Sequence, residues 1–158
     1  MKKYKSILII ISIYLLDLIT KLIVTSNIKL HGSKEVIKNF FYITYTKNKG
    51  AAFSILENKI YIILIVTVFI LAYLVKELLK KDNKKIYDLS LSLILGGLLS
   101  NLSDRLFLGY VRDFIDFRFG SYNFAIFNVG DIFIVCGCII YLISILMEEK
   151  HEQNSKRK

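Results

Sequence analysis

Long apolar segments alternate with polar segments along the chain. Because a helix needs about 20 predominantly apolar residues to cross a bilayer core, each apolar segment is a candidate membrane span. The third segment is short, and its start is therefore placed at residue 86. The chain contains no proline that would interrupt a helix. The pattern predicts four transmembrane helices, at residues 6–24, 60–76, 86–102 and 131–147.

Two long polar segments separate these helices, at residues 25–59 and 103–130. Inside them, residues 38–46 and 110–119 are rich in aromatic and β-branched side chains, which is typical of strands. We expect these strands to lie on the membrane surface. With no internal repeat or linker, residues 1–158 form one domain. The fold class is thus an α-helical integral membrane protein with four transmembrane helices and a small extracytoplasmic β element.

The composition supports a membrane protein over a water-soluble one. Hydrophobic residues make up 54% of the 158 residues and charged residues only 22%, with a mean hydropathy of +0.51. A soluble core of this size could not hide so much apolar surface. The net charge of +9 could indicate nucleic-acid binding, but the basic residues lie mostly between apolar segments. Membrane lipid, and no nucleic acid, is therefore the expected partner.

The first apolar segment follows three lysines and could be mistaken for a cleavable signal peptide. Asp17 and Lys21 lie inside it, four residues apart and hence on one helical face, and no small-residue cleavage site follows. We expect the segment to be retained. The pair is expected either to tie the first helix to the bundle or to reach toward the headgroups.

The distribution of Lys and Arg predicts the orientation. Residues 1–5, 76–88 and 148–158 hold 12 in 29 residues, whereas residues 25–59 and 103–130 hold 9 in 63. Because cytoplasmic loops carry an excess of basic residues, both termini are expected in the cytoplasm.

The few Cys and His residues give no sign of metal or thiol chemistry. Cys136 and Cys138 share one apolar segment, and His31 and His151 lie in polar stretches. No pair has the spacing of a zinc site. We expect neither a metal nor another cofactor.

Polar and ionisable residues crowd both ends of the 103–130 segment. Two carboxylates that share one proton can hydrolyse a peptide bond, one as general base and the other as general acid, without a metal. The candidates for such a site, with their amide and guanidinium neighbours, are Asn101, Asp104, Arg105, Asp113, Asp116, Asn128 and Asp131.

The alternation of side chains along the second predicted strand shows which of two carboxylates is the better candidate for acid–base catalysis. If residues 110–119 are extended, Asp113 shares a face with Ile115 and other apolar residues, while Asp116 lies with Arg112 and Arg118. A carboxylate in apolar surroundings has a raised pKa and suits acid–base catalysis, whereas one beside guanidinium groups suits a salt bridge. The pattern therefore favours Asp113.

The other two carboxylates lie next to helix ends. Asp131 opens the fourth helix, where the helix dipole stabilises its charge, and it can equally serve as an N-terminal cap. Asp104 is followed directly by Arg105, so it is expected to position another group rather than to titrate.

Five short motifs together resemble the type II signal peptidases, which process bacterial lipoproteins. In chain order they are DLITK (17–21), NKGAAF (48–53), NLSDR (101–105), VRDFID (111–116) and FNVGD (127–131). The resemblance implies an aspartyl endopeptidase of the bacterial cell membrane, with its active site near the outer leaflet. It implies cleavage of lipidated prolipoproteins on the amino side of a diacylglyceryl-modified cysteine.

The resemblance also implies roles for individual residues. The family's catalytic aspartates fall on Asp113 and Asp131. Its substrate-binding residues fall on Asn48, Gly50, Asn101, Asp104, Arg105 and Asn128. The first two also cradle globomycin-type inhibitors in the family. Asp17 and Lys21 are supporting residues. The chain departs from the family pattern at Ser100, Arg112, Ala125, Gly130 and Ile132.

Two other classes of protein fit part of the pattern. A small proton-coupled transporter could use Asp17, Lys21 and the carboxylates of the polar segments as a relay. A noncatalytic adaptor could use Gly96 and Gly97 for helix packing. The charges lie mostly at helix ends, which counts against a transporter.

Overall fold

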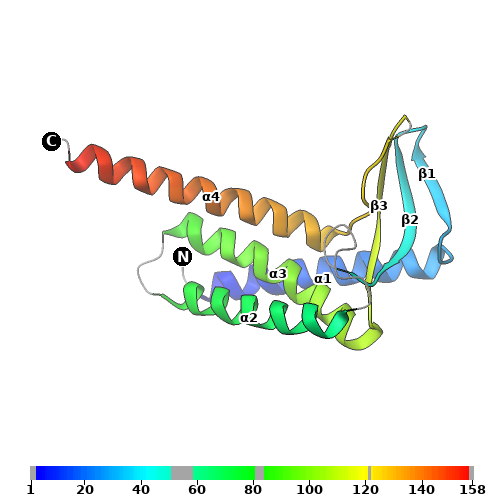
Figure 1. The fold of residues 1–158 in the computed structure, drawn as a ribbon, viewed down its shortest axis with the longest axis horizontal. Coiled ribbons are helices and arrows are strands. Elements are labelled where there is room, and N and C mark those ends of the chain that lie inside the picture. The colour runs from blue at the N-terminus through cyan, green and yellow to red at the C-terminus, as the bar shows by residue number, and fades with distance from the viewer. Residues whose placement is uncertain (1–2, 51–58, 81–83, 121, 157–158) are drawn as a thin grey trace.

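The computed structural model describes residues 3–50, 59–80, 84–120 and 122–156 and has a bundle of helices with a sheet at one end (Figure 1). Four of the helices are long and apolar enough to cross a membrane, as the sequence predicts. They are α1 (Lys3–Asn27), α2 (Ile60–Leu79), α3 (Lys85–Leu108) and α4 (Val129–Lys156).

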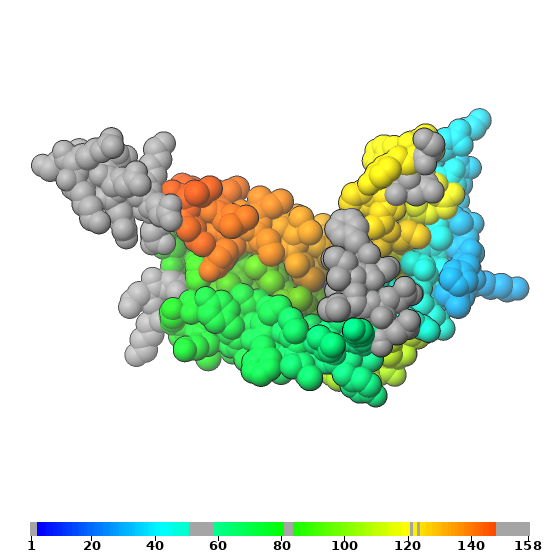
Figure 2. All heavy atoms as spheres, in the orientation of Figure 1, coloured from blue at the N-terminus to red at the C-terminus, as the bar shows by residue number. Residues whose placement is uncertain are grey.

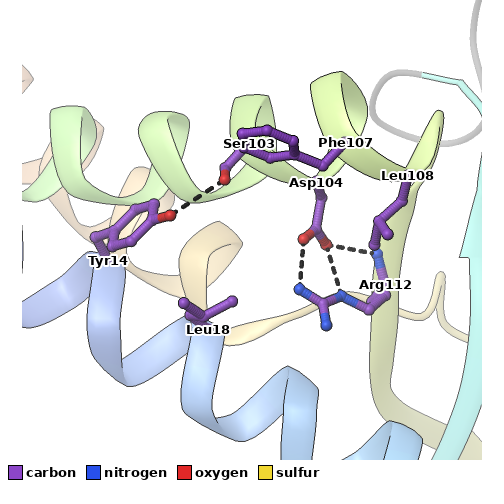
Figure 3. Close-up of a pocket in the computed structure, with 7 residues that line it drawn as sticks. All are labelled: Tyr14, Leu18, Ser103, Asp104, Phe107, Leu108 and Arg112. Atoms are coloured by element: carbon purple, nitrogen blue, oxygen red, sulfur yellow. Dashed lines mark hydrogen bonds and ion pairs between the residues drawn. The ribbon is translucent and has the colours of Figure 1, made fainter.

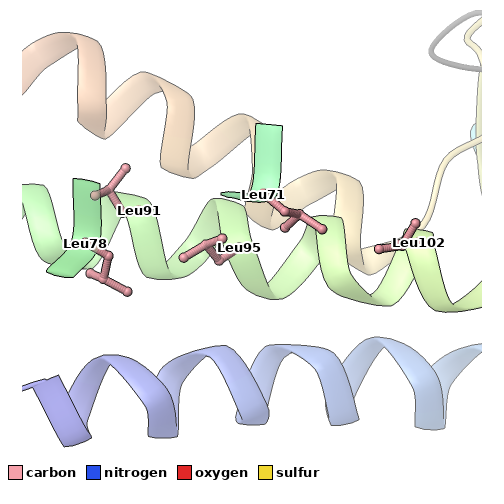
Figure 4. Close-up of a cluster of buried hydrophobic side chains, with 5 residues drawn as sticks. All are labelled: Leu71, Leu78, Leu91, Leu95 and Leu102. Atoms are coloured by element: carbon pink, nitrogen blue, oxygen red, sulfur yellow. The ribbon is translucent and has the colours of Figure 1, made fainter. Parts of the chain in front are cut away.

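Helix α3 is the centre of the bundle and packs against each of the other three helices. Its leucines meet α2 in a buried cluster, in which no side chain is more than 9% exposed (Figure 4). The other helices present most of their apolar side chains outward, as expected where lipid is the solvent. The cluster consists of Leu71 and Leu78 of α2 with Leu91, Leu95 and Leu102 of α3.

Glycines allow α3 and α4 to approach closely. A Cβ on Gly97 would overlap the backbone carbonyl of Gly130, and one on Gly137 would meet the backbone of Ser90. Small residues at such contacts let helix backbones pack directly in a membrane.

We expect Gly97→Ala to destabilise the fold by about 1–3 kcal/mol, because the added methyl group forces the two backbones apart. The thermal unfolding midpoint of the detergent-solubilised protein measures this effect. Leu106→Ala is the matched control on the same helix, because Leu106 is 59% exposed. An equal midpoint for both variants would contradict the close packing.

The helices extend beyond the predicted ranges. Helix α3 continues past residue 102 to Leu108 and ends at Gly109, which has φ of 78° and donates its N–H to the carbonyl of Arg105. The apolar pattern stops earlier because Asp104 and Arg105 follow it, yet both are accommodated inside the protein. The helix therefore continues into the polar segment predicted to begin at residue 103, a boundary that rests on hydropathy alone.

An antiparallel sheet lies at the end of the bundle where α1 and α3 finish and α4 begins. Strands β2 and β3 overlap the two predicted strands, whereas β1, with its charged residues, was not predicted. The strands are β1 (Ser33–Ile37), β2 (Phe41–Asn48), β3 (Val111–Phe119) and the short β4 (Tyr122–Asn123), paired in that order.

The pairing of β2 with β3 brings the two polar segments together. Thr46 pairs with Asp113 and Asn48 with Val111, and the register shifts between Ile43 and Thr46. Consequently the end of β2 lies beside Asp113. Phe127, just before α4, bridges to Ile115 on the other edge of β3.

Candidate active site

The N-terminus of α4 is held by a reciprocal cap. The side-chain Oδ1 of Asn128 accepts the backbone N–H of Asp131 at 3.0 Å, and Asp131 Oδ2 accepts the backbone N–H of Asn128 at 3.1 Å. This arrangement satisfies helix-end N–H groups and fixes the Asp131 carboxylate. Asp131 thus takes part in the cap, but Asn128 is the capping residue because the helix begins at Val129; Oδ1 of Asp131 is left for another partner.

Asp113 projects from β3 to the same place. Asn48 Nδ2 donates to its Oδ2 at 2.9 Å, and Asn128 Nδ2 donates to its Oδ1 at 2.6 Å. The residue is only 2% exposed. Burial, together with the nearby negative charge of Asp131, raises the pKa of Asp113 to about 7, although both amides act in the opposite direction.

Asn101 links the carboxylate pair to the centre of the bundle. Its Nδ2 donates to Asp131 Oδ1 at 2.8 Å. Its Oδ1 accepts from Lys21 Nζ at 2.9 Å and from Asn128 Nδ2 at 3.2 Å. Because Lys21 can only donate, it fixes which end of the Asn101 amide faces Asp131.

The buried Lys21 also pairs with two carboxylates. Its Nζ lies 2.6 Å from Asp17 Oδ2 and 3.3 Å from Asp104 Oδ2, and both Lys21 and Asp17 are completely buried. Asp17 in turn accepts from Ser100 of α3 at 2.5 Å and from the backbone N–H of Gly130 in α4 at 2.8 Å. The pair therefore ties α1 to α3 and α4, and the alternative of a headgroup contact is wrong.

Asp104 has both oxygens occupied by cations. Arg112 donates to its Oδ1 from Nη2 at 2.6 Å, and to its Oδ2 from Nε at 3.2 Å and from the backbone N–H at 3.0 Å. Oδ2 also faces Lys21. The expectation that Asp104 positions other groups matches this geometry. Arg112 does not accompany Asp116 as predicted, because the short turn from α3 to β3 brings it next to Asp104.

Arg105 connects the site to the segment after β2. Its Nη2 donates to the carbonyl of Gly50 at 2.8 Å, while the backbone N–H of Gly50 donates to Asn48 Oδ1 at 2.9 Å. Arg105 also interacts electrostatically with both Asp113 and Asp131. The motif continues into residues 51–53, which lie outside the described residues.

Asp116 is equally buried but lies in a different environment. Its Oδ2 accepts from Arg118 Nη2 at 2.6 Å and from Thr44 Oγ1 at 2.7 Å. The salt bridge to Arg118 is the one predicted from strand alternation. Asp116 therefore has a structural partner, which distinguishes it from Asp113.

A cavity of about 280 Å³ lies on the α1 side of α3, at the start of β3 (Figure 3). The ion pair between Asp104 and Arg112 forms one wall, and the hydroxyl groups of Tyr14 and Ser103 meet at 3.1 Å on another. Neither Asp113 nor Asp131 lines it. The remaining lining residues are Leu18, Phe107 and Leu108.

Comparisons with known proteins match this arrangement over most of the chain. The family model of signal peptidase (SPase) II matches residues 9–147. The chain belongs to the signal peptidase II family. It is 43% identical over 135 residues to the lipoprotein signal peptidase of Caldanaerobacter subterraneus subsp. tengcongensis, covering 85% of this chain and 91% of that protein.

Other members of the signal peptidase II family are similarly close. The lipoprotein signal peptidase of Clostridium tetani is 39% identical over 148 residues, covering 92% of this chain and 95% of that protein. A solved bacterial membrane enzyme structure superposes with a TM-score of 0.87 at 36% identity, covering 93% of this chain and 90% of that chain. The chain is thus a membrane protease of this family, and the transporter alternative is not supported.

The donor groups at this signal peptidase II site do not suit a resident metal. Within the described ranges, no group of three or more His, Cys, Asp or Glu residues could hold an ion. Cys136 and Cys138 are exposed side chains of α4.

Sequence reasoning missed several contacts of the site. The roles of Ser100 and Gly130 as donors to Asp17 follow from helix packing and leave no sequence signal. The pairing of Arg112 with Asp104 could have been anticipated, since a strand that begins just after a helix brings its first residues back to the last turn. The departures from the family pattern at Ser100 and Arg112 therefore each have a buried partner.

Proposed function

We propose that the protein removes the signal peptide of diacylglyceryl-modified prolipoproteins, cutting on the amino side of the lipidated cysteine, with Asp113 and Asp131 as the catalytic pair. The observation that carries the proposal is the joint fixation of two carboxylates by Asn128, which bonds to both: the buried Asp113 and the partly buried Asp131. A pair of this kind holds one proton between two groups of unequal acidity.

In this mechanism Asp113 holds the shared proton at neutral pH, because its pKa is raised to about 7. Asp131, fixed by the helix N-terminus and by Asn101, is the base. The oxygen of a water molecule attacks the scissile carbonyl carbon while Asp131 takes a proton from that water. At the same time Asp113 donates its proton to the carbonyl oxygen. Collapse of the tetrahedral intermediate then breaks the C–N bond: the proton held by Asp131 passes to the leaving amine, and one hydroxyl of the intermediate returns its proton to Asp113, which restores both carboxyl groups to their starting states.

The groups around the pair would bind the substrate. Arg105 and Gly50 lie beside the carboxylates, and Asn48 joins Gly50 to Asp113. We assign these three residues to holding the peptide backbone, and a globomycin-type inhibitor would occupy the same place. Asp104, with both oxygens paired, supports the site from inside rather than touching substrate.

We further propose that both termini are cytoplasmic and that the carboxylate pair lies near the outer leaflet of the bacterial cell membrane. The density of basic residues supports this orientation. A signal peptide enters the membrane with its basic end inside, so its lipidated cysteine would meet carboxylates at the outer ends of α3 and α4.

Single cysteines test the orientation. In a background without Cys136 and Cys138, we expect a cysteine at Lys29, between α1 and β1, to react with a membrane-impermeant thiol reagent on intact cells. A cysteine at Lys84, at the start of α3, should react only after the cells are opened. The reverse pattern would contradict the proposed orientation.

The pH dependence of cleavage tests the proton assignment. Since Asp113 must be protonated to act as the acid, we expect kcat to fall as the pH rises through about 7. Asn48→Ala removes a hydrogen bond that stabilises the ionised form, so it should move this limb to higher pH. Glu35→Gln, an exposed change in β1, should leave the limb in place. A kcat that stays constant between about pH 6 and 9 would contradict the assignment.

The function itself is tested with purified protein and a diacylglyceryl-modified prolipoprotein. We expect a shorter product whose formation is blocked by globomycin, and no product from the same precursor without the lipid. Cleavage that ignores both the lipid and globomycin would contradict the proposed substrate class.

A further inference from the structure

The two faces of the sheet differ in character. Residues paired directly across neighbouring strands lie on the same face. On one face, polar side chains form a connected network: Tyr42 donates to Glu35 at 3.0 Å, Arg118 stacks over the Tyr42 ring at 3.9 Å, and Arg118 pairs with Asp116. This polar face needs no protein cover.

The opposite face is apolar. Phe41 pairs with Phe117 and Ile43 with Ile115, and Ile37 pairs with Phe41 from the edge strand. Aromatic rings continue along this face, with centroids 5.0 to 6.1 Å apart, from Phe127 beside α4 to the far end of the strands. We call this surface the apolar face; its rings are Phe40, Phe41, Phe117, Phe119, Phe124 and Phe127.

Helices cover only the near part of the apolar face. Val24 of α1, Ile28 just after α1 and Val129 of α4 pack against Ile115 and its neighbours. The far ends of β1, β2 and β3 project past the side of the bundle, beyond the start of α4 (Figure 1). There the side chains are open: Ile37 is 52%, Phe40 38%, Phe119 53% and Phe124 40% exposed. These four residues are here called the apolar tip.

The candidate membrane span of α4 begins at Val129, which packs against the apolar face of the sheet. Figure 2 shows an open hollow between α4 and β3, on the side that the apolar face looks into. Helix α4 exposes apolar side chains in its first turns, where Ile132 is 40% and Val135 57% exposed, and this part of the helix lies in a candidate membrane span. Lipid around a span that begins at Val129 would lie close to the apolar tip, because the ring of Phe124 packs against that of Phe127, two residues before Val129.

We propose that the apolar tip inserts into the leaflet at the sheet end of the bundle and contacts membrane lipid directly. Exposed aromatic and aliphatic groups rimmed by polar ones are typical of surfaces that lie at the boundary of headgroups and acyl chains. The contact anchors β3 at both ends, through α4 at Phe127 and through lipid at Phe119, and so holds the strand that carries Asp113 at a fixed height above the bilayer.

The absence of tryptophan from the sequence makes a direct test possible. Phe119→Trp places a single fluorophore on the apolar tip, and Phe40→Trp, in the turn between β1 and β2, is a second choice. Tyr42→Trp is the matched control on the polar face. Ile139→Trp, on the exposed side of α4, gives the signal of a side chain deep in the bilayer.

Each variant is reconstituted, without substrate, into vesicles containing lipids brominated either near the headgroup end or near the methyl end of the acyl chain. We expect Trp at 119 or 40 to be quenched at least about twice as strongly as Trp at 42. Bromines near the headgroup end should quench Trp at 119 or 40 more than bromines near the methyl end do. Trp at 139 should show the opposite order. This readout does not depend on cleavage, so its outcome is separate from that of the proposed function.

Three outcomes would overturn the proposal. Quenching at 119 and 40 no stronger than at 42, with full access to aqueous acrylamide, would place the tip in water. Protection from acrylamide without quenching by brominated lipid would indicate cover by a second copy of the chain. Quenching that arises only when a prolipoprotein with brominated acyl chains is added would assign the apolar tip to the substrate lipid.

Discussion

Asp113→Asn and Asp131→Asn are each expected to lower the rate of prolipoprotein cleavage by about 10²- to 10⁴-fold or more, because each removes one of the two groups that transfer protons. The amide has nearly the same shape as the carboxylate and keeps one acceptor oxygen, so only one of the two hydrogen bonds from Asn48 and Asn128 to Asp113 is lost, without any loss of volume. Cleavage of a diacylglyceryl-modified substrate by the purified variants measures the effect. The amount of folded protein recovered from the membrane should remain close to that of the unmodified chain.

Asp116→Asn is the matched control for this experiment. Asp116 lies in the same strand and is 3% exposed, against 2% for Asp113, but its carboxylate is held by Arg118 and Thr44. We therefore expect this variant to lose some stability and to keep most of its activity. An inactive Asp116 variant alongside an active Asp113 variant would contradict the assignment of the pair.

Lys21→Met is expected to have the largest effect on stability. Its removal leaves Asp17 and Asp104 as buried carboxylates without this cation, and breaking a buried ion pair from one side costs about 3–5 kcal/mol. It also releases the Asn101 amide, whose other end binds Asp131. The yield of folded protein and its thermal midpoint in detergent measure the change.

Two further variants test whether the loss of stability comes from the buried charges left without Lys21. Lys38→Met removes an exposed lysine in the turn before Phe40 and should leave the midpoint unchanged. Asp17→Asn combined with Lys21→Met should recover part of the lost stability, because one of the two stranded charges is removed. If Lys21→Met is as stable as Lys38→Met, the buried cluster does not hold the bundle together.

The helices could be predicted from the sequence because lipid imposes a simple rule. A segment that crosses the bilayer must satisfy its backbone hydrogen bonds internally and expose apolar side chains, so hydropathy alone marks it. The rule fails where polar residues are buried by protein instead. At Asp104 and Arg105 it ended α3 too early, since both side chains find partners in the interior.

The site was predictable only in part. Alternation along β3 separated Asp113 from Asp116, and the helix start at Asp131 was visible in the sequence. The convergence of Asn48, Asn101 and Asn128 on these carboxylates depends on contacts between distant segments, which composition and periodicity do not encode. Asn101 and Asn128 were candidates because of their place at the ends of the polar segment, whereas Asn48 was selected only by resemblance to a known motif. Strand β1 escaped prediction because its pairing partner β2, rather than its own pattern, makes it a strand.

The most direct test of the account is the mass of the products formed by the purified protein from a diacylglyceryl-modified prolipoprotein, with and without a metal chelator. We expect two fragments, one of which begins with the lipidated cysteine. They should form at the same rate after exhaustive chelation, and the Asp113→Asn variant should not form them. Cleavage that disappears on chelation and returns with zinc, or that persists in Asp113→Asn, would contradict an aspartyl mechanism at this site.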